Sequence, residues 1–304
     1  MEICHDLVPS KEACAVALGN FDGLHLGHRR VLSLALAGAG RGLLPAVLTF
    51  DARPADGLIF SQERKARILG RLGFRRLYLL HFETVRGMGA EEFVGAALAG
   101  ACRAKLACCG FNFTFGRGGA AGCEDLSRMC AARGIGTAVA PAVLAGGRPV
   151  SSTRIRGLIA EGRVEEAARL LPCPFGYESA VLPGRRLGRR LGTPTLNQTL
   201  PAGFVRPKFG VYVSAVYFGG GAYAGVTNVG VRPTVGGKEA LAETWMPRYS
   251  GGDLYGETVR VDLLRFLRPE ARFAGLPELR GAILRDGEEA AAYFLKNPVP
   301  PAFP

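Results

Sequence analysis

The chain has no apolar run long enough to cross a membrane. Apolar stretches such as residues 43–50 are ended by charge or glycine well short of the roughly 18 residues that a membrane span needs. Residues 1–12 carry acidic side chains and have no apolar core, so this segment does not have the pattern of a signal peptide. We therefore expect a cytoplasmic protein without a membrane partner.

Metal-binding and disulfide patterns are also missing. The chain has eight cysteines, but the central ones do not have the paired C-x-x-C spacing of zinc knuckles. A disulfide framework is equally untypical of a chain of this length without a signal peptide. We expect the cysteines to be buried, reduced and structural, because free cysteine behaves as a small hydrophobe.

Acidic residues are scarce relative to basic ones. The 26 Asp and Glu residues face 38 Lys and Arg residues, so the formal net charge is +12. Such an excess suits polyanionic ligands, either nucleotide phosphates or nucleic acid. A basic nucleic-acid-binding protein is one alternative, and its affinity would fall steeply with salt. The single tryptophan, Trp245, and the lack of an aromatic–basic string count against that alternative.

The pattern of apolar runs divides the 304 residues into two parts, in keeping with about 150 residues per domain. The first part alternates predicted strands with predicted helices, which favours a parallel sheet covered on both faces, a doubly wound α/β fold. The predicted strands are 13–18, 43–50, 76–82, 106–110 and 136–140. The predicted helices are 28–39, 63–72, 90–104, 124–133, 153–161 and 164–171.

From residue 177 the pattern changes to short alternating runs separated by glycine clusters. The runs at 179–182, 210–218, 222–226 and 257–264 predict a small antiparallel barrel or sandwich. A helix over 276–295 is expected to close this part. Pro172 and Pro174 end the preceding helical region, so we place the boundary there and expect domains 1–174 and 175–304.

The most informative stretch is residues 18–28, Leu-Gly-Asn-Phe-Asp-Gly-Leu-His-Leu-Gly-His, between a predicted strand and a predicted helix. Its first glycines allow a tight turn, and Gly27 leaves space at the start of the helix. The amino terminus of a helix favours phosphate, and His25 and His28 can share one helix face there. Two imidazoles in that position can stabilise the charge that develops during transfer at phosphorus. A structural turn with two surface histidines is the alternative.

Two further elements suit the same chemistry. Residues 150–156, Val-Ser-Ser-Thr-Arg-Ile-Arg, combine hydroxyls suited to cap a helix with Arg154 and Arg156, whose guanidinium groups make fork contacts with phosphate. Residues 110–117, Gly-Phe-Asn-Phe-Thr-Phe-Gly-Arg, place aromatic rings at alternate positions before a glycine turn, as in a pocket for a flat ligand. Taken singly, these elements also fit an ordinary capped basic helix and a buried strand end.

A second candidate site lies in the β-rich part. Residues 184–197 form a Gly- and Arg-rich loop of the kind that cradles phosphates, and they end in Gly-Thr-Pro-Thr-Leu-Asn. Thr195 and Asn197 alternate on an extended strand, so both can point the same way and offer oxygen ligands suited to Mg²⁺. Glu243 stands among apolar and neutral residues, where a carboxylate can accept a proton from a substrate hydroxyl. A basic surface hairpin with a solvated acid is the alternative.

Taken together, the segments 18–28, 110–117, 150–156, 184–197 and 243–244 resemble the prokaryotic bifunctional riboflavin kinase/FAD synthetases, over nearly the whole chain and in the same order. The first three resemble the FMN adenylyltransferase module, a nucleotidyltransferase of the H-x-G-H superfamily. The Gly-x-Pro-Thr-x-Asn segment resembles the riboflavin kinase module. The resemblance implies a transferase that makes FMN and ADP from riboflavin and ATP, then FAD and pyrophosphate from FMN and ATP, with Mg²⁺ in both reactions.

The resemblance also implies a role for each candidate residue. Those expected to act directly are His25, His28 and Arg154 in adenylyl transfer, Glu243 as the general base of the kinase, and Thr195 and Asn197 as ligands of Mg²⁺. Those expected to bind ATP or the flavin are Gly19, Asn20, Phe21, Asp22, Gly27, Asn112, Ser152, Thr153, Arg156, Gly188, Gly192, Pro194 and Asn228.

The chain departs from the family pattern at three positions. Arg53 stands where the family has histidine before proline, Thr193 where it has a phenylalanine-type residue, and Trp245 where it has histidine. None of these positions carries a group assigned to the chemistry, so they bear on rates rather than on reaction class. Two enzymatic alternatives follow: only one activity is retained, or the H-x-G-H module uses another substrate. The kinase-like part argues against the latter, and the oligomeric state stays open.

Overall fold

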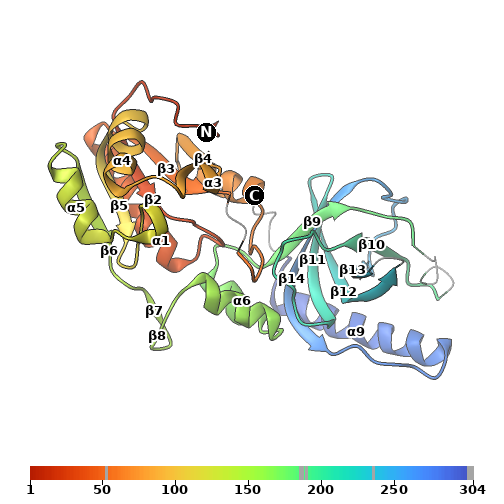
Figure 1. Cartoon of the computed structure of the whole chain (residues 1–304). Coiled ribbons are helices and arrows are strands. Elements are labelled where there is room, and N and C mark those ends of the chain that lie inside the picture. Colours follow the sequence, from red (N-terminus) through yellow and green to blue (C-terminus); the bar gives the residue numbers. More distant parts are fainter. Residues whose placement is uncertain (52–53, 185–187, 189–190, 235–236, 300–304) are drawn as a thin grey trace. The chain divides into compact units, whose positions relative to one another are not determined.

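The computed structural model describes residues 1–51, 54–184, 188, 191–234 and 237–299, except for the side chains of 232–239 (Figure 1). Contacts divide the chain into two compact units, Met1–Pro54 with Ser61–Ser152, and Ala55–Phe60 with Thr153–Pro304. Each unit has its own sheet. No helix in the described part of the chain has both the length and the apolar composition to cross a membrane.

The first unit is built on six parallel strands in the order β1-β4-β3-β2-β5-β6 (Figure 1). The strands are β1 (Glu2–Cys4), β2 (Cys14–Leu18), β3 (Leu44–Phe50), β4 (Arg76–Leu80), β5 (Ala104–Gly110) and β6 (Gly136–Ala140), followed by the hairpin β7 (Leu144–Ala145) and β8 (Arg148–Pro149). The helical segments are α1 (Leu26–Ala37), η1 (Gly38–Arg41), α2 (Gln62–Arg71), α3 (Phe82–Val85), α4 (Ala90–Glu92), η2 (Phe93–Ala101), η3 (Arg117–Gly119) and α5 (Cys123–Ala131).

Strand β2 lies inside this sheet, and all of its residues are buried. Val16 and Leu18 belong to a core that also contains residues of η2 and α5. Ala15 points to the other face, where a Cβ on Gly38, at the end of α1, would come within 2.4 Å of the alanine Cβ. A strand buried on both faces is typical of a parallel sheet covered by helices on both sides. The predicted doubly wound fold is confirmed.

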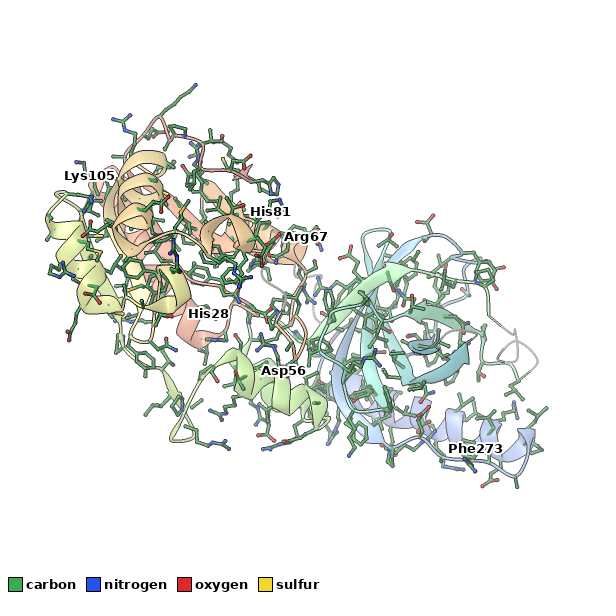
Figure 2. All side chains as sticks on the ribbon, in the orientation of Figure 1. His28, Asp56, Arg67, His81, Lys105 and Phe273 are labelled. Atoms are coloured by element: carbon green, nitrogen blue, oxygen red, sulfur yellow. The ribbon has the colours of Figure 1, made fainter. Side chains whose placement is uncertain are left out.

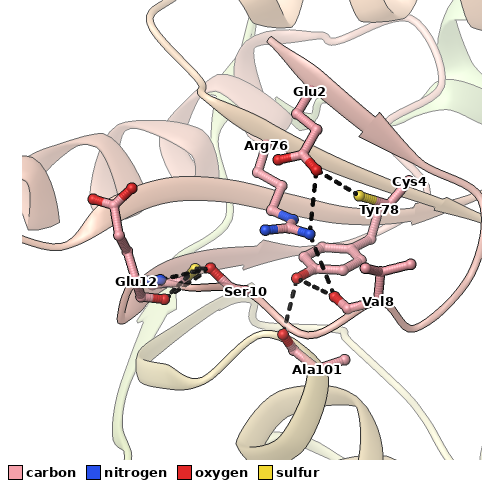
Figure 3. Close-up of polar contacts among 9 residues, drawn as sticks. Glu2, Cys4, Val8, Ser10, Glu12, Arg76, Tyr78 and Ala101 are labelled. Atoms are coloured by element: carbon pink, nitrogen blue, oxygen red, sulfur yellow. Dashed lines mark hydrogen bonds and ion pairs between the residues drawn. The ribbon is translucent and has the colours of Figure 1, made fainter.

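Polar contacts with β4 tie the N-terminal segment to the sheet (Figure 3). The Tyr78 hydroxyl donates to the carbonyl of Ala101 at 2.9 Å and lies 3.1 Å from the carbonyl of Val8. Arg76 forms an ion pair with Glu2 at 3.4 Å. Burial raises the pKa of the Tyr78 phenol, so this group remains a hydrogen-bond donor at neutral pH.

The second unit is built on six antiparallel strands in the order β10-β13-β12-β11-β14-β9 (Figure 1). The strands are β9 (Gly176–Ala180), β10 (Thr195–Thr199), β11 (Gly210–Phe218), β12 (Gly221–Thr234), β13 (Gly237–Trp245) and β14 (Thr258–Arg268). Helices α6 (Ser152–Ala160) and α7 (Val164–Leu170) precede the sheet, and α9 (Leu276–Lys296) follows it.

The two edge strands β9 and β10 nearly close this sheet into a barrel. The Leu182 N–H donates to the carbonyl of Asn197 at 2.7 Å. The side-chain amide of Gln198, fully buried, donates to the carbonyls of Ser179 at 2.7 Å and Val259 at 2.8 Å. Side-chain donors therefore satisfy carbonyl groups along the seam between the edges.

The two faces of the barrel sheet differ in what they contact. Inside, the Thr227 hydroxyl donates to Ser214 at 2.7 Å and lies 2.9 Å from the Thr244 hydroxyl. Outside, α9 packs on β11 and β12 through a cluster that includes Val226 and Ala290. Because strand residues alternate between faces, the neighbours of the two threonines in sequence point outward.

The expected barrel and closing helix are confirmed, but β13 is absent from the predicted strands. Its sequence, Gly-Lys-Glu-Ala-Leu-Ala-Glu-Thr-Trp, contains few residues that favour strands. Pairing with β10 on one side and β12 on the other fixes its extended conformation. All eight cysteines lie in the described residues as free thiols, and every one except Cys123 is buried.

Gln198→Ala removes two of the side-chain hydrogen bonds at the barrel seam and leaves the buried carbonyls of Ser179 and Val259 without this donor. We expect the free energy of unfolding to fall by about 2–3 kcal/mol, measured by urea denaturation. Thr258→Ala, at an exposed position on β14, is the control and should change stability by less than about 0.5 kcal/mol. Equal stability of the two variants would show that these bonds do not hold the seam.

Candidate active sites

The carboxyl ends of β2 and β5 mark the point where the order of strands in the parallel sheet reverses. The chain runs from β2 through β3 to β4 on one side, then returns to place β5 and β6 on the other. Strands β2 and β5 are direct neighbours, with Val16 opposite Ala107. In doubly wound sheets, ligands bind outside the carboxyl ends at such a switch point. The loops after Leu18 and Gly110 both start at this edge.

The loop after β2 has an unusual backbone. Phe21 and Leu24 have φ values of 52° and 47°, and Gly23 has 80°. Left-handed conformations are costly for residues other than glycine, and they cluster at functional sites. The buried Phe21 ring lies against Gly19, where a Cβ would come within 3.2 Å of it, and meets the His28 ring edge-to-face at 5.3 Å.

His25 and His28 form a stacked pair at the start of α1, with ring centroids 3.6 Å apart. His28 is labelled in Figure 2. The His28 backbone N–H donates to Nδ1 of His25 at 3.2 Å. A neutral His25 must then carry its proton on Nε2, where it can donate to an anion. A Cβ on Gly27 would lie 3.1 Å from the His25 ring, so the absence of a side chain there leaves room for the pair.

Two other predicted residues of the first unit join this edge of the sheet. The Ser152 hydroxyl donates to the carbonyl of Asp22 at 2.9 Å, which ties the start of α6 to the loop. Asn112 follows β5 with an exposed side chain. Phe115, by contrast, is buried in the core, and its ring stacks on Phe113.

Thr153, Arg154 and Arg156 belong to the second compact unit. Arg156 Nε donates to the carbonyl of Gly57 at 2.8 Å, a contact that ties the segment 55–60 to α6. Arg154 is half-buried, and Thr153 is exposed. The predicted role of these residues at the triphosphate stays a prediction.

Three predicted kinase residues lie in one row across the barrel. Glu243 on β13 is directly opposite Asn197 on β10 and directly opposite Asn228 on β12. All three belong to the outward face, where Asn197 is buried, Asn228 half-buried and Glu243 exposed. The next row on the same face contains Thr195 opposite Trp245. Strand register therefore collects residues separated by up to 46 positions in the sequence (243 − 197).

The donor set on β10 fits Mg²⁺. Thr195 and Asn197 share a face, and the Asn197 amide nitrogen lies 3.5 Å from the Thr195 carbonyl. A Cβ on Gly184 would come within 2.3 Å of that amide nitrogen, so glycine is required for the loop to approach Asn197. Hydroxyl and amide oxygens are hard ligands, and Mg²⁺ in nucleotide sites takes most of its other ligands from phosphates and water. Among the residues described, no group of three or more His, Cys, Asp or Glu could hold a metal.

Two cavities lie in the barrel unit, and Thr195 lines one of them. One of about 300 Å³ is lined by Pro194, Thr195, Tyr249 and residues 251–255, among others. The other, of about 340 Å³, lies between β12 and α9 and is lined by residues that include Tyr223, Tyr249 and Phe294. Tyr249 lines both cavities. Cavities of this size suit parts of nucleotide- or flavin-sized ligands.

The remaining loop glycines are needed for close packing or a turn. A Cβ on Gly188 would come within 2.3 Å of the Thr193 carbonyl, and Gly192 has a φ of 75°. Arg185, Arg186, Arg189 and Arg190 of this loop, and Arg53, lie outside the described residues.

Comparison with known proteins gives one family match in each part of the chain. The FAD synthetase family model matches residues 7–154, and the riboflavin kinase model matches residues 171–294. The chain belongs to the bifunctional riboflavin kinase/FMN adenylyltransferase family. The family member of Listeria monocytogenes is 32% identical over 92% of either chain, and that of Pseudomonas fluorescens is 34% identical over 97% of this chain and 96% of the relative.

A solved structure extends the similarity to the fold. The crystal structure described as a macrolide-efflux protein from Streptococcus pneumoniae has a TM-score of 0.87 and 30% identity to this chain. It covers 95% of this chain, and 98% of its own length is matched. That likeness supports the order of a parallel α/β unit followed by an antiparallel barrel.

Two departures from the family pattern have a structural setting. Thr193 is buried, and its N–H donates to the carbonyl of Gly188 at 2.8 Å. Trp245 packs against α9, where a Cβ on Gly287 would come within 2.6 Å of the indole. Sequence reasoning missed Gly287 and Tyr249 because only the packing of α9 and the loop after β13 brings them to this face.

Gly287→Ala should crowd the indole of Trp245 and push α9 away from the row that contains Trp245 and Val226. We expect a loss of about 1–3 kcal/mol in stability of the barrel and a weaker riboflavin kinase reaction, measured by calorimetry and flavin chromatography. Gly281→Ala on the same helix is the control, because its Cβ would meet nothing closer than 3.4 Å. That substitution should be neutral or stabilising by up to about 1 kcal/mol. If both variants behave alike, the contact with Trp245 does not set the position of α9.

Proposed function

We propose that this chain phosphorylates riboflavin with ATP to give FMN and ADP, and adenylylates FMN with a second ATP to give FAD and pyrophosphate. The observation that carries this proposal is that each unit gathers its own set of predicted site residues. The His25–His28 pair lies at the switch point of the parallel sheet, and Glu243 lies between Asn197 and Asn228 on the barrel.

In adenylyl transfer, the protein's task is to place two substrates in line and to stabilise the leaving pyrophosphate. Nε2–H of His25 and the His28 ring are suited to donate to the ATP phosphates, and the start of α1 adds its N–H groups and dipole. Gly19, Asn20, Phe21, Asp22 and Gly27 form the floor of this site, with Ser152 tied to Asp22. Asn112 faces the flavin. Thr153, Arg154 and Arg156 contact the triphosphate.

In the kinase reaction, Glu243 accepts the proton of the ribityl hydroxyl as that oxygen attacks the γ-phosphorus of ATP. Thr195 and Asn197 would hold Mg²⁺, which neutralises phosphate charge when bound. Asn228, Pro194, Gly188 and Gly192 shape the nucleotide loop and the neighbouring cavity. The exposed position of Glu243 supports this role, because a general base must reach the substrate.

We place the boundary between the two catalytic modules near residue 174, with 1–174 and 175–304 as the modules. The riboflavin kinase model, which begins at residue 171, supports a boundary close to this position, whereas the two compact units divide after Ser152. We also propose a cytoplasmic location, where riboflavin and ATP are both available.

His28→Ala removes one imidazole from the proposed phosphate site. We expect the conversion of FMN to FAD to slow by about 100- to 1000-fold, while the conversion of riboflavin to FMN is unchanged. Flavins are separated by chromatography after incubation with ATP and Mg²⁺. His5→Ala, an exposed histidine near the N-terminus, should leave both rates unchanged. Normal FAD formation by His28→Ala would contradict the assignment of this site.

Glu243→Gln keeps the size of the side chain but removes the basic carboxylate. We expect riboflavin phosphorylation to slow by about 100- to 10,000-fold, while added FMN is still converted to FAD. Glu289→Gln, an exposed residue on α9, is the matched control. A wild-type protein that makes FMN but no FAD would retain one activity only. Turnover of neither flavin would overturn the proposed function.

A further inference from the structure

Helix α2 carries a lysine on its buried side. Lys65 is 3% exposed, and its helix neighbours Ala66, Ile68 and Leu69 are also buried. An ammonium group loses its hydration at such a position, which costs stability unless other groups bind the charge. The hydrogen-bond acceptors of the Lys65 ammonium therefore indicate its role.

The Lys65 ammonium reaches the loop that precedes the histidine pair. Nζ donates to the backbone carbonyl of Asn20 at 3.2 Å and to the Thr49 hydroxyl at 3.3 Å. The Thr49 hydroxyl, fully buried on β3, itself donates to the same Asn20 carbonyl at 2.9 Å. One carbonyl group thus receives two hydrogen bonds, from α2 and from β3.

The Asn20 carbonyl lies next to a strained part of the backbone. It directly precedes Phe21, which has a φ of 52°. Conformations of this kind are strained and persist only when the surroundings hold them in place. The same loop leads to His25 and His28 at the start of α1. Any rotation of the Asn20 peptide group changes the path of the chain toward the histidines.

We propose that Lys65 is a positioning residue for adenylyl transfer, whose ammonium acts with the Thr49 hydroxyl to hold the Asn20 carbonyl and thereby the loop that presents His25 and His28. The inference rests on the proposed function of this site. Lys65 touches no reacting atom in this role. It acts through the backbone of the loop.

The charge of this lysine depends on pH near neutrality. Burial lowers the pKa of the Lys65 ammonium to about 8, against the opposing effect of the nearby carboxylates of Asp22 and Asp51. The pKa of Asp51 is itself lowered, chiefly by the hydrogen bond from the Phe82 N–H and further by His81, so this carboxylate stays charged. Above about pH 8 the loop loses a charged donor.

The same shift predicts how Lys65 affects stability. Because the folded chain binds this proton less tightly than the unfolded chain, the unfolded state holds more protons between about pH 8 and the ordinary lysine pKa of 10.5. The lysine therefore lowers stability at pH 7, and this penalty declines as pH rises through that window. If Lys65 served only to pack the core, replacing it with an apolar side chain would lower the stability at pH 7.

The test compares Lys65→Met with wild type in the full chain. We expect kcat for FAD formation from FMN to fall by about 10- to 100-fold, with a smaller change in KM for ATP. The riboflavin kinase rate of the same protein, which depends on the second unit, should not change. The melting temperature at pH 7 should be equal or higher. Lys105→Met, an exposed lysine at the amino end of β5 (Figure 2), should leave both rates unchanged.

A pH profile separates positioning from a general structural role. The wild-type kcat for adenylyl transfer should fall as pH rises through about 8, while Lys65→Met should lack this step. Thr49→Val should also slow FAD formation, and Thr49→Ser, which keeps the hydroxyl, should restore it. If Lys65→Met does not fold, this second pair decides the matter.

Two outcomes would overturn the role of Lys65 but leave the proposed function intact. One is wild-type FAD formation by Lys65→Met or by Thr49→Val. The other is an equal loss of both activities with a lower melting temperature in Lys65→Met, together with normal FAD formation in Thr49→Val. A wild-type protein that forms no FAD from FMN would instead refute the proposed function, and the role of Lys65 with it.

Discussion

Hydrogen-bonded register between neighbouring strands is the constraint on which both candidate sites depend. In the parallel sheet, the pairing of β2 with β5 brings two loops to one edge, where the histidine pair and Asn112 lie. In the barrel, the pairing of β13 with both β10 and β12 places Glu243 between Asn197 and Asn228. A slip of one residue in the pairing of β13 would turn Glu243 to the opposite face of the sheet.

Buried polar groups add a second level of control over backbone position. Gln198 supplies the donors at the barrel seam, and Lys65 supplies them beneath the loop after β2. Each group gives up hydration on burial, so each is stable only while its acceptors stay in place. This coupling explains how a loop with left-handed residues keeps a single conformation. It also means that the groups most important for geometry need not contribute to stability.

The two proposed reactions are linked by chemistry, because FMN is the product of one and a substrate of the other. Each unit nevertheless has its own sheet, its own proposed phosphate site and its own match to a family model. Both reactions rely on charge neutralisation and placement of ATP rather than on a covalent protein intermediate. The excess of basic residues suits a chain that handles two ATP molecules and phosphorylated flavins.

The sequence by itself determined the α/β and barrel classes, the two motif-bearing segments and the family, because each of these depends on short-range patterns of glycine, polar and apolar residues. The residues His25, His28, Thr195 and Asn197 were candidates from their motifs, and the family resemblance implied their roles. Only the tertiary structure decided that β13 is a strand, that Glu243 stands between two asparagines, and that Trp245 packs on Gly287. The role of Lys65 could not be predicted from the sequence either. A lysine in a helix is normally expected to be solvated, and only the structure shows that this one is buried against Asn20 and Thr49. The physical reason is common to all of these: contacts between residues far apart in the chain are set by sheet pairing and burial, which no local pattern encodes.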